Sequence, residues 1–130
     1  MDLRLTVTES PDLRSPSSAS SDPGSASVMM AAKRTRLILS GAIDLTMVSE
    51  FSEAVAECLE RALPLDVDLR HVTFMDSSGV ATLSRLLTKD SPVQPVRMIK
   101  PPDMVQFLLD VTGLASQVEI LQEDPGFESN

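Results

Sequence analysis

The sequence predicts an α/β fold built around one mixed β-sheet. Segments in which apolar and polar residues alternate, as they do in strands, take turns with segments in which apolar residues recur every three or four positions, as they do in helices. With 130 residues, 42% of them hydrophobic, the chain is long enough and apolar enough for one ordinary domain. We therefore expect a mixed sheet of four to five strands and about three helices, in the order β-β-α-β-α-β-α-β.

The N-terminal part is predicted to contain one strand and a long loop. Apolar and polar residues alternate over residues 2–8, which is typical of a half-buried strand. Serine and proline then dominate, and we expect a mobile loop at about residues 9–30, because this composition buries too little apolar surface to become ordered. Loops of this length are unusual inside a compact domain. The alternative is a domain that begins near Val28, with a loosely attached first strand.

A second strand and an amphipathic helix are predicted next. The strand covers residues 36–41 and could pair with the first strand as an antiparallel hairpin. The helix that follows has one apolar stripe, formed by Val48, Phe51, Val55, Cys58 and Ala62. Thr46 is its expected N-cap, and Pro64 forces the chain out of the helix.

The remaining strands and helices alternate. Three further strands are predicted, over residues 63–75, 96–100 and 118–120. One helix is expected over residues 79–89, and another opens at Pro101-Pro102 and ends at Gly113 in a left-handed cap. We expect a single domain over residues 1–122, interrupted by the serine-rich loop, and a polar tail over residues 123–130.

Composition excludes several classes of function. The net charge of −8 and the pI of about 4.5 argue against nucleic acid and against an anionic membrane surface as direct partners, since both require basic patches. No apolar run approaches the roughly 18 residues that span a bilayer. The single Cys58 cannot form an internal disulfide, and its place on an apolar stripe predicts a buried, inert thiol. We expect a cytoplasmic protein.

The sequence shows no pattern that indicates an enzyme. His71 is the one histidine, and the G-x-S-x-G pattern of a nucleophile elbow is missing. Asp66, Asp68 and Asp76 are not spaced with His71 as a recognisable metal site, and no glycine-rich phosphate loop is present. We therefore expect no cofactor, no metal and no catalytic residue. Hydrolysis through Ser77 and His71 is kept as an alternative.

The tetrad Asp76-Ser77-Ser78-Gly79 lies where a predicted strand passes into a predicted helix. Two hydroxyls at a helix N-terminus lie near free backbone N–H groups and the positive end of the helix dipole, which favour an anionic group. One interpretation is an ordinary helix cap, which composition alone favours. The other is a site at which a serine accepts a phosphate.

Three segments resemble one family. Residues 41–46, Gly-Ala-Ile-Asp-Leu-Thr, resemble the G-E-[IL]-D-x-[AT] entry to the first helix of the STAS domain family, with Ala42 at the usual acidic position. Residues 72–80, Val-Thr-Phe-Met-Asp-Ser-Ser-Gly-Val, resemble its phosphorylation segment F-[IM]-D-S-S-G-[LV], with Ala81 where a second glycine is common. Residues 104–114 end in Thr-Gly-Leu, as the third helix of the family does.

The resemblance implies an anti-sigma factor antagonist of bacterial partner switching. In that branch, the unphosphorylated protein binds an anti-sigma factor that is also a serine kinase, and a phosphatase resets the switch. The phosphoacceptor would be Ser77, with Ser78 as the less favoured alternative. The partner surface would include Asp44, Thr46, Asp76, Ser77, Ser78, Gly79, Thr82 and Arg85, the last two on the exposed side of the second helix. A STAS domain that serves as an accessory subunit of a transport or stress-sensing complex is the alternative function.

Overall fold

The computed structural model describes residues 23–127, which form a five-stranded sheet, three α-helices and two short 3-10 helices. The strands are β2 (Ser25–Met30), β3 (Thr35–Ile43), β4 (Leu65–Met75), β5 (Val96–Ile99) and β6 (Glu119–Leu121). The helical segments are η1 (Leu45–Met47), α1 (Val48–Arg61), α2 (Ser77–Ser84), α3 (Asp103–Thr112) and η2 (Leu114–Gln117).

The sheet is mixed, as predicted. Its strand order is β2-β3-β4-β5-β6; β2 and β3 are antiparallel, and the other neighbouring pairs are parallel. The described elements follow the predicted order β-β-α-β-α-β-α-β. The central strand, β4, has parallel neighbours on both sides, and every residue from Leu65 to Leu69 is buried.

The first strand of this sheet lies where we expected a loop. Residues 25–30, the end of the segment predicted as loop over 9–30, form β2. Ala26 and Val28 turn toward the core, whereas Ser25 and Ser27 are exposed. Burial thus alternates with every residue over 25–28, and the backbone of β2 pairs with that of β3. A serine-rich sequence therefore forms an edge strand. The strand predicted over residues 2–8 and the rest of the predicted loop lie outside the described residues.

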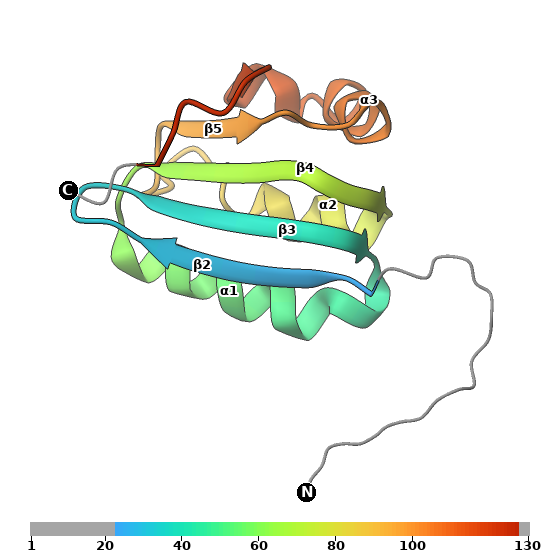
Figure 1. The fold of residues 1–130 in the computed structure, drawn as a ribbon, viewed down its shortest axis with the longest axis horizontal. Helices are drawn as coiled ribbons and strands as arrows, with labels where there is room; N and C mark the ends of the chain where they lie inside the picture. Colours follow the sequence, from blue (N-terminus) through green and yellow to red (C-terminus); the bar gives the residue numbers. More distant parts are fainter. Residues whose placement is uncertain (1–22, 128–130) are drawn as a thin grey trace, which may run out of the picture.

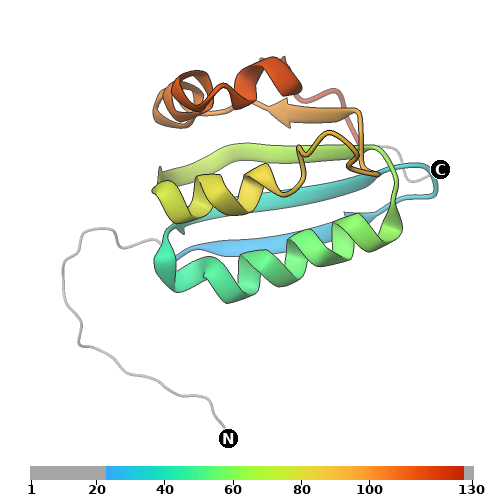
Figure 2. The same cartoon turned by 180° about the vertical axis from the view of Figure 1, so that it is seen from behind.

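The two faces of the sheet differ. α1 and α2 cover one face, and within residues 23–127 no helix covers the opposite face of β2, β3 and β4 (Figures 1 and 2). The core fills the space between the sheet and these helices; Phe51 of α1, Leu39 of β3 and Leu83 of α2 are almost completely buried there. α3 lies near the β5 side of the sheet and buries Val105 and Leu109. The helix-free face leaves strand side chains open to contact.

The second helix starts earlier and ends earlier than predicted. α2 covers Ser77–Ser84 rather than residues 79–89. After it the chain continues in tighter turns, in which the N–H of Leu86 donates to the Leu83 carbonyl and that of Leu87 to the Ser84 carbonyl, each at 3.0 Å. Leu86 and Leu87 are buried by this turn. The apolar pattern that predicted a longer helix is therefore satisfied without one.

A buried carboxylate near the start of β4 binds the β2–β3 hairpin and the first residues of β3 and β5. Asp66 in β4 is fully buried and accepts hydrogen bonds from Arg34 in the β2–β3 hairpin at 2.8 Å, from Arg36 in β3 at 3.4 Å and from Arg97 in β5 at 2.8 Å. A charge this deep in a protein is tolerated only when it is paired. Asp66 therefore ties the β2–β3 hairpin and β5 to the central strand.

The segment after β6 closes over the same cluster. We expected residues 123–130 to form a polar tail outside the domain, but Asp124 forms ion pairs with Arg36 at 3.0 Å and Arg70 at 2.6 Å. The Phe127 ring centroid lies 5.1 Å from Cζ of Arg36, within the range of a cation–π contact. The hydrogen bonds from Arg36 and Arg70 hold the pKa of Asp124 well below its usual range. Residues 124–127 are thus part of the fold.

Replacing this tail carboxylate should weaken the fold in a pH-dependent way. Asp124→Ala is expected to lower the free energy of unfolding by about 1–2 kcal/mol near neutral pH, because Arg36 and Arg70 lose a charged acceptor. The depressed pKa of Asp124 means that this stabilisation is present above the ordinary value of 3.8 and is lost as the pH falls below it. Urea unfolding at about pH 7 and about pH 3 measures the difference. Glu123→Ala is the control, and equal effects of the two variants would contradict the assignment.

Candidate functional site

Two capped turns lie side by side where β3 and β4 end. Ile43 and Met75, the last residues of these strands, are partners in the parallel register. Asp44 and Asp76 follow them directly, and each caps the next helical segment, Asp44 that of η1 and Asp76 that of α2. The carboxyl edge of a parallel sheet is a common place for binding sites. The fold thus brings together two motifs that are 32 residues apart in the sequence, at positions 44 and 76.

Asp76 determines how α2 begins. Its Oδ1 accepts hydrogen bonds from the Ser78 backbone N–H at 2.9 Å, the Gly79 backbone N–H at 3.3 Å and the Ser78 hydroxyl at 2.5 Å. These donors, the Ser78 hydroxyl foremost, hold the pKa of Asp76 below its usual range. Asp76 is therefore an ionised N-cap at neutral pH, and the capping function expected for the tetrad belongs to this residue.

The two serines of the tetrad occupy different environments. Ser77 is the first residue of α2 and is exposed, and no group within residues 23–127 forms a hydrogen bond with its hydroxyl. Ser78 is half-buried, and its hydroxyl donates to Asp76. Reaction at Ser78 would first have to break this hydrogen bond to an ionised acceptor, which is of the strong, charge-assisted kind. Ser77 carries no such cost.

Gly79 lets α2 start close against the end of β3. A Cβ at this position would lie 2.8 Å from the carbonyl oxygen of Ile43 and 2.8 Å from Cγ of Met75, closer than real Cβ atoms approach their neighbours. The same Ile43 carbonyl accepts the backbone N–H of Asp76 at 3.4 Å. The first turn of α2 is therefore held against β3 as well as against β4, from which it continues.

The turn before α1 is capped by Asp44 rather than by Thr46. Asp44 Oδ1 accepts from the Thr46 backbone N–H at 3.0 Å and from the Thr46 hydroxyl at 2.6 Å. We expected Thr46 to be the N-cap of the first helix, and this was wrong because the 3-10 turn η1 precedes α1, which begins only at Val48. Thr46 itself remains exposed and available to a partner.

Only one of the two residues expected on the exposed side of the second helix is exposed. Thr82 is 6% exposed, and its hydroxyl donates to the Ser78 carbonyl at 2.9 Å. It lies on the buried side of α2, so its assignment to the partner surface was wrong. A threonine can be placed there because its one polar group is satisfied within its own helix. Arg85, immediately after α2, is exposed as expected.

Two apolar side chains near the tetrad were missed by the sequence analysis. Leu45, which follows Asp44, is 72% exposed, and Phe74, which is paired in register with Ala42, is 48% exposed. A signal for Phe74 was present, since adjacent strand residues point to opposite faces and Met75 is buried. Leu45 carried no comparable signal, because its exposure depends on the turn between β3 and α1.

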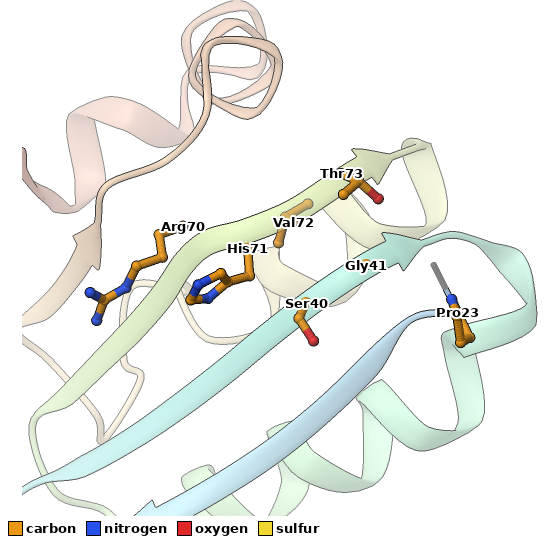
Figure 3. Close-up of a pocket in the computed structure, with 7 residues that line it drawn as sticks. All are labelled: Pro23, Ser40, Gly41, Arg70, His71, Val72 and Thr73. Atoms are coloured by element: carbon orange, nitrogen blue, oxygen red, sulfur yellow. The ribbon is translucent and has the colours of Figure 1, made fainter. Parts of the chain in front are cut away.

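The histidine lies away from the serines of the tetrad. His71 helps to line a shallow pocket of about 450 Å³ on the helix-free face of the sheet. The full lining comprises Pro23, Ser40, Gly41, Arg70, His71, Val72 and Thr73 (Figure 3). Neither Ser77 nor Ser78 belongs to it. The pocket therefore gives no geometric support to a hydrolase that would use Ser77 with His71.

The structure also places the remaining candidates. Cys58 is fully buried, which confirms the predicted burial, and desolvation raises the pKa of its thiol to about 11, so that little of the nucleophilic thiolate forms near neutral pH. Within residues 23–127, no three His, Cys, Asp or Glu side chains are arranged to hold a metal ion. In the same part of the chain, none of the helices has the length and apolarity needed to cross a bilayer.

The contact at Gly79 leads to a stability prediction. Gly79→Ala should lower the free energy of unfolding by about 1–3 kcal/mol, because the added methyl must push the helix away from two strand ends. Helix propensity alone would favour the opposite sign, by up to about 1 kcal/mol. Ala81→Gly, at an exposed position of the same helix, is the reference for propensity. Thermal and urea unfolding measure the change in stability. A Gly79→Ala variant that is more stable than wild type would contradict the close packing of α2 against the ends of β3 and β4.

Comparisons with known proteins agree with this architecture. A family model described as Mlab, STAS domain, matches residues 26–122. A crystal structure of an anti-sigma factor antagonist from Mycobacterium paratuberculosis aligns with a TM-score of 0.69 and 19% identity, over 78% of this chain and 88% of that chain. A search of curated proteins found no significant match.

Two further solved structures concern one protein in two states. The anti-sigma factor antagonist SpoIIAA in its unphosphorylated form aligns with a TM-score of 0.60 and 19% identity, over 76% of this chain and 90% of that one. The Bacillus cell fate determinant SpoIIAA in the phosphorylated form aligns with a TM-score of 0.57 and 17% identity, over 76% and 93%. At these identities the solved structures establish the shared fold. The family model spans the sheet from β2 to β6 and most of the sequence, and on this basis the chain belongs to the STAS domain family.

Proposed function

We propose that this protein is an anti-sigma factor antagonist controlled by phosphorylation of Ser77. In the unphosphorylated state it binds an anti-sigma factor that is also a serine kinase, and phosphorylation releases that partner. A serine phosphatase restores the binding state. The protein acts by binding rather than by catalysis, and through the anti-sigma factor it regulates sigma-factor-dependent transcription in the cytoplasm.

The observation that carries this proposal is the difference between the two serines. Ser77 is exposed at the first position of α2 with a hydroxyl that has no hydrogen-bond partner among residues 23–127, whereas the Ser78 hydroxyl is held by Asp76. A kinase must reach the acceptor hydroxyl and align it for attack on a phosphoryl group. Ser77 meets this requirement without a change in the fold, and Ser78 does not.

The similar structures support the same assignment. Two of them are described as anti-sigma factor antagonists, and one of these, SpoIIAA, is described in both an unphosphorylated and a phosphorylated form. The D-S-S-G segment of this chain lies at the junction of β4 and α2, with Ser77 exposed, Asp76 and Ser78 half-buried and Gly79 buried. The position of Ser77 in this segment is consistent with a serine that is phosphorylated.

Electrostatics explain how a phosphate on Ser77 would release a partner. The group adds about −1.5 to −2 charges near neutral pH. Asp76 already uses the N–H groups of Ser78 and Gly79, so those donors are not free to neutralise the phosphate. A partner that covers Ser77 would have to desolvate this dianion beside the Asp76 carboxylate. A loss of only about 3 kcal/mol in binding free energy weakens affinity by roughly a hundredfold.

A kinase assay with matched serine variants tests the acceptor. Wild type and Ser78→Ala should incorporate phosphate equally when incubated with ATP and an anti-sigma factor serine kinase from the same organism, whereas Ser77→Ala should incorporate none. Phosphopeptide mapping identifies the modified residue. Full incorporation into Ser77→Ala would show that the acceptor is another residue. If the wild-type protein accepts no phosphate from any co-encoded kinase, the result favours the alternative function, an accessory subunit without a phosphorylation cycle.

The phosphate should act on the binding surface and leave the fold unchanged. Backbone amide chemical shifts of the phosphorylated and unphosphorylated proteins are expected to differ around residues 43–47 and 74–80, where the two capped turns meet. Shifts of α3, on the β5 side of the sheet, should stay the same. Widespread changes across α3 would mean that phosphorylation works by refolding, contrary to this mechanism.

A further inference from the structure

Large apolar side chains are exposed at few places in residues 23–127, and two of them flank the tetrad. The full set is Met29, Met30, Leu45, Phe74, Phe107 and Val111. Leu45 and Phe74 belong to the two turns that meet at the carboxyl ends of β3 and β4. Met29 and Met30 lie at the opposite end of the sheet, because they pair with the first two residues of β3.

Leu45 and Phe74 stand close to the phosphoacceptor. Leu45 is two residues after Ile43, whose carbonyl accepts the Asp76 backbone N–H at 3.4 Å, and this contact places the turn that holds Leu45 beside the cap of α2. Phe74 precedes Asp76 by two residues, and its register partner Ala42 precedes Asp44 by two. Leu45 therefore lies near the start of α2, whereas Phe74 lies three residues before Ser77 in the strand that leads into α2, with its side chain on the face of β4 opposite to the buried Met75. A partner that covers the carboxyl ends of β3 and β4 could contact both side chains.

The charges around this pair are of one sign. Asp44 directly precedes Leu45, and Asp76 follows Phe74 by two residues. Neither carboxylate forms an ion pair with a cation within residues 23–127, and their hydrogen bonds come from uncharged donors. The carboxylates of the ionic cluster at the other end of the sheet, by contrast, are all paired with arginines. The surface near Ser77 thus combines exposed apolar area with uncompensated negative charge, on a chain whose net charge is −8.

We infer that Leu45 and Phe74 are the apolar anchors of the surface that binds the anti-sigma factor, and that the matching surface of that partner is an apolar recess with lysine or arginine at its rim. The inference rests on the proposed function and adds the chemistry of the partner to it. Few residues carry most of the binding energy in an interface, and they lie in well-packed pockets from which water is excluded. Charge complementarity at the rim speeds association and selects the partner.

This arrangement also explains why Ser77 is an effective place for a switch. Apolar anchors bind only if water leaves their surroundings, and a phosphate beside them retains water strongly. The modification therefore opposes the burial of Leu45 and Phe74 and also adds to the negative charge of Asp44 and Asp76.

The test is a binding titration of the unmodified protein against the kinase that phosphorylates Ser77, with ADP in place of ATP so that no phosphate is transferred. Leu45→Ala and Phe74→Ala should each weaken binding by about tenfold or more. Met30→Ala, at a side chain that is 52% exposed and at the other end of the sheet, is the matched control and should bind as wild type. Wild-type affinity should fall as salt is raised, because the rim contacts are ionic. Thermal unfolding checks that the variants are folded.

Each other result has a distinct meaning. If Leu45→Ala and Phe74→Ala both bind with wild-type affinity, and phosphorylation still abolishes binding, the assignment of these residues as anchors is wrong. The proposed function is then unaffected. Failure of the unmodified wild type to bind any kinase that phosphorylates it would refute the proposed function itself. If sedimentation shows a wild-type dimer that Leu45→Ala converts to monomer, the surface binds a second copy of this chain and the inferred partner is wrong.

Discussion

The site depends on how closely α2 can start against the end of β3. The Ile43 carbonyl accepts the backbone N–H of Asp76, and the same oxygen leaves no space for a Cβ at residue 79. With the first turn held there, the Asp76 carboxylate reaches the N–H groups of Ser78 and Gly79 and takes the Ser78 hydroxyl as a third donor. A glycine and a capping carboxylate together determine which serine faces the solvent. If the helix began one residue later, Ser78 rather than Ser77 would occupy its first position.

The two ends of the sheet use their charges in opposite ways. At the N-terminal end, Asp66 is buried among arginines, and Asp124 from the segment after β6 pairs with Arg36 and Arg70. These charges are satisfied within the chain, where they fasten the strands to each other. At the carboxyl end, Asp44 and Asp76 serve as caps and keep their net charge facing outward. A modification at Ser77 therefore changes the surface at one end without disturbing the ionic cluster at the other.

Much of the fold could be predicted because each strand and helix carries its own period of apolar residues. The prediction was wrong where local composition and tertiary context disagree. β2 looks like loop when read alone, since three of its six residues, at positions 25, 26 and 27, read Ser-Ala-Ser; it is a strand because β3 supplies backbone partners for it. Thr82 was assigned to the exposed side of its helix although it is buried, because the sequence does not show how the helix is rotated about its own axis on the sheet. The polar tail joins the fold through Asp124, whose partners are 88 and 54 residues away.

The sequence by itself determined the class of fold, the position of the tetrad between a strand and a helix, and the family resemblance from which Ser77 is proposed as the phosphoacceptor. These follow from local periodicity and from a contiguous motif. Only the tertiary structure decided which hydroxyl is free, that the turns of Asp44 and Asp76 lie side by side, and that Leu45 and Phe74 are exposed. Such properties depend on the register between β3 and β4 and on the approach of α2 to Ile43. The neighbouring turns arise from contacts between residues more than 30 positions apart, which no local pattern in the sequence records, whereas the held Ser78 hydroxyl depends on Asp76, two residues before it.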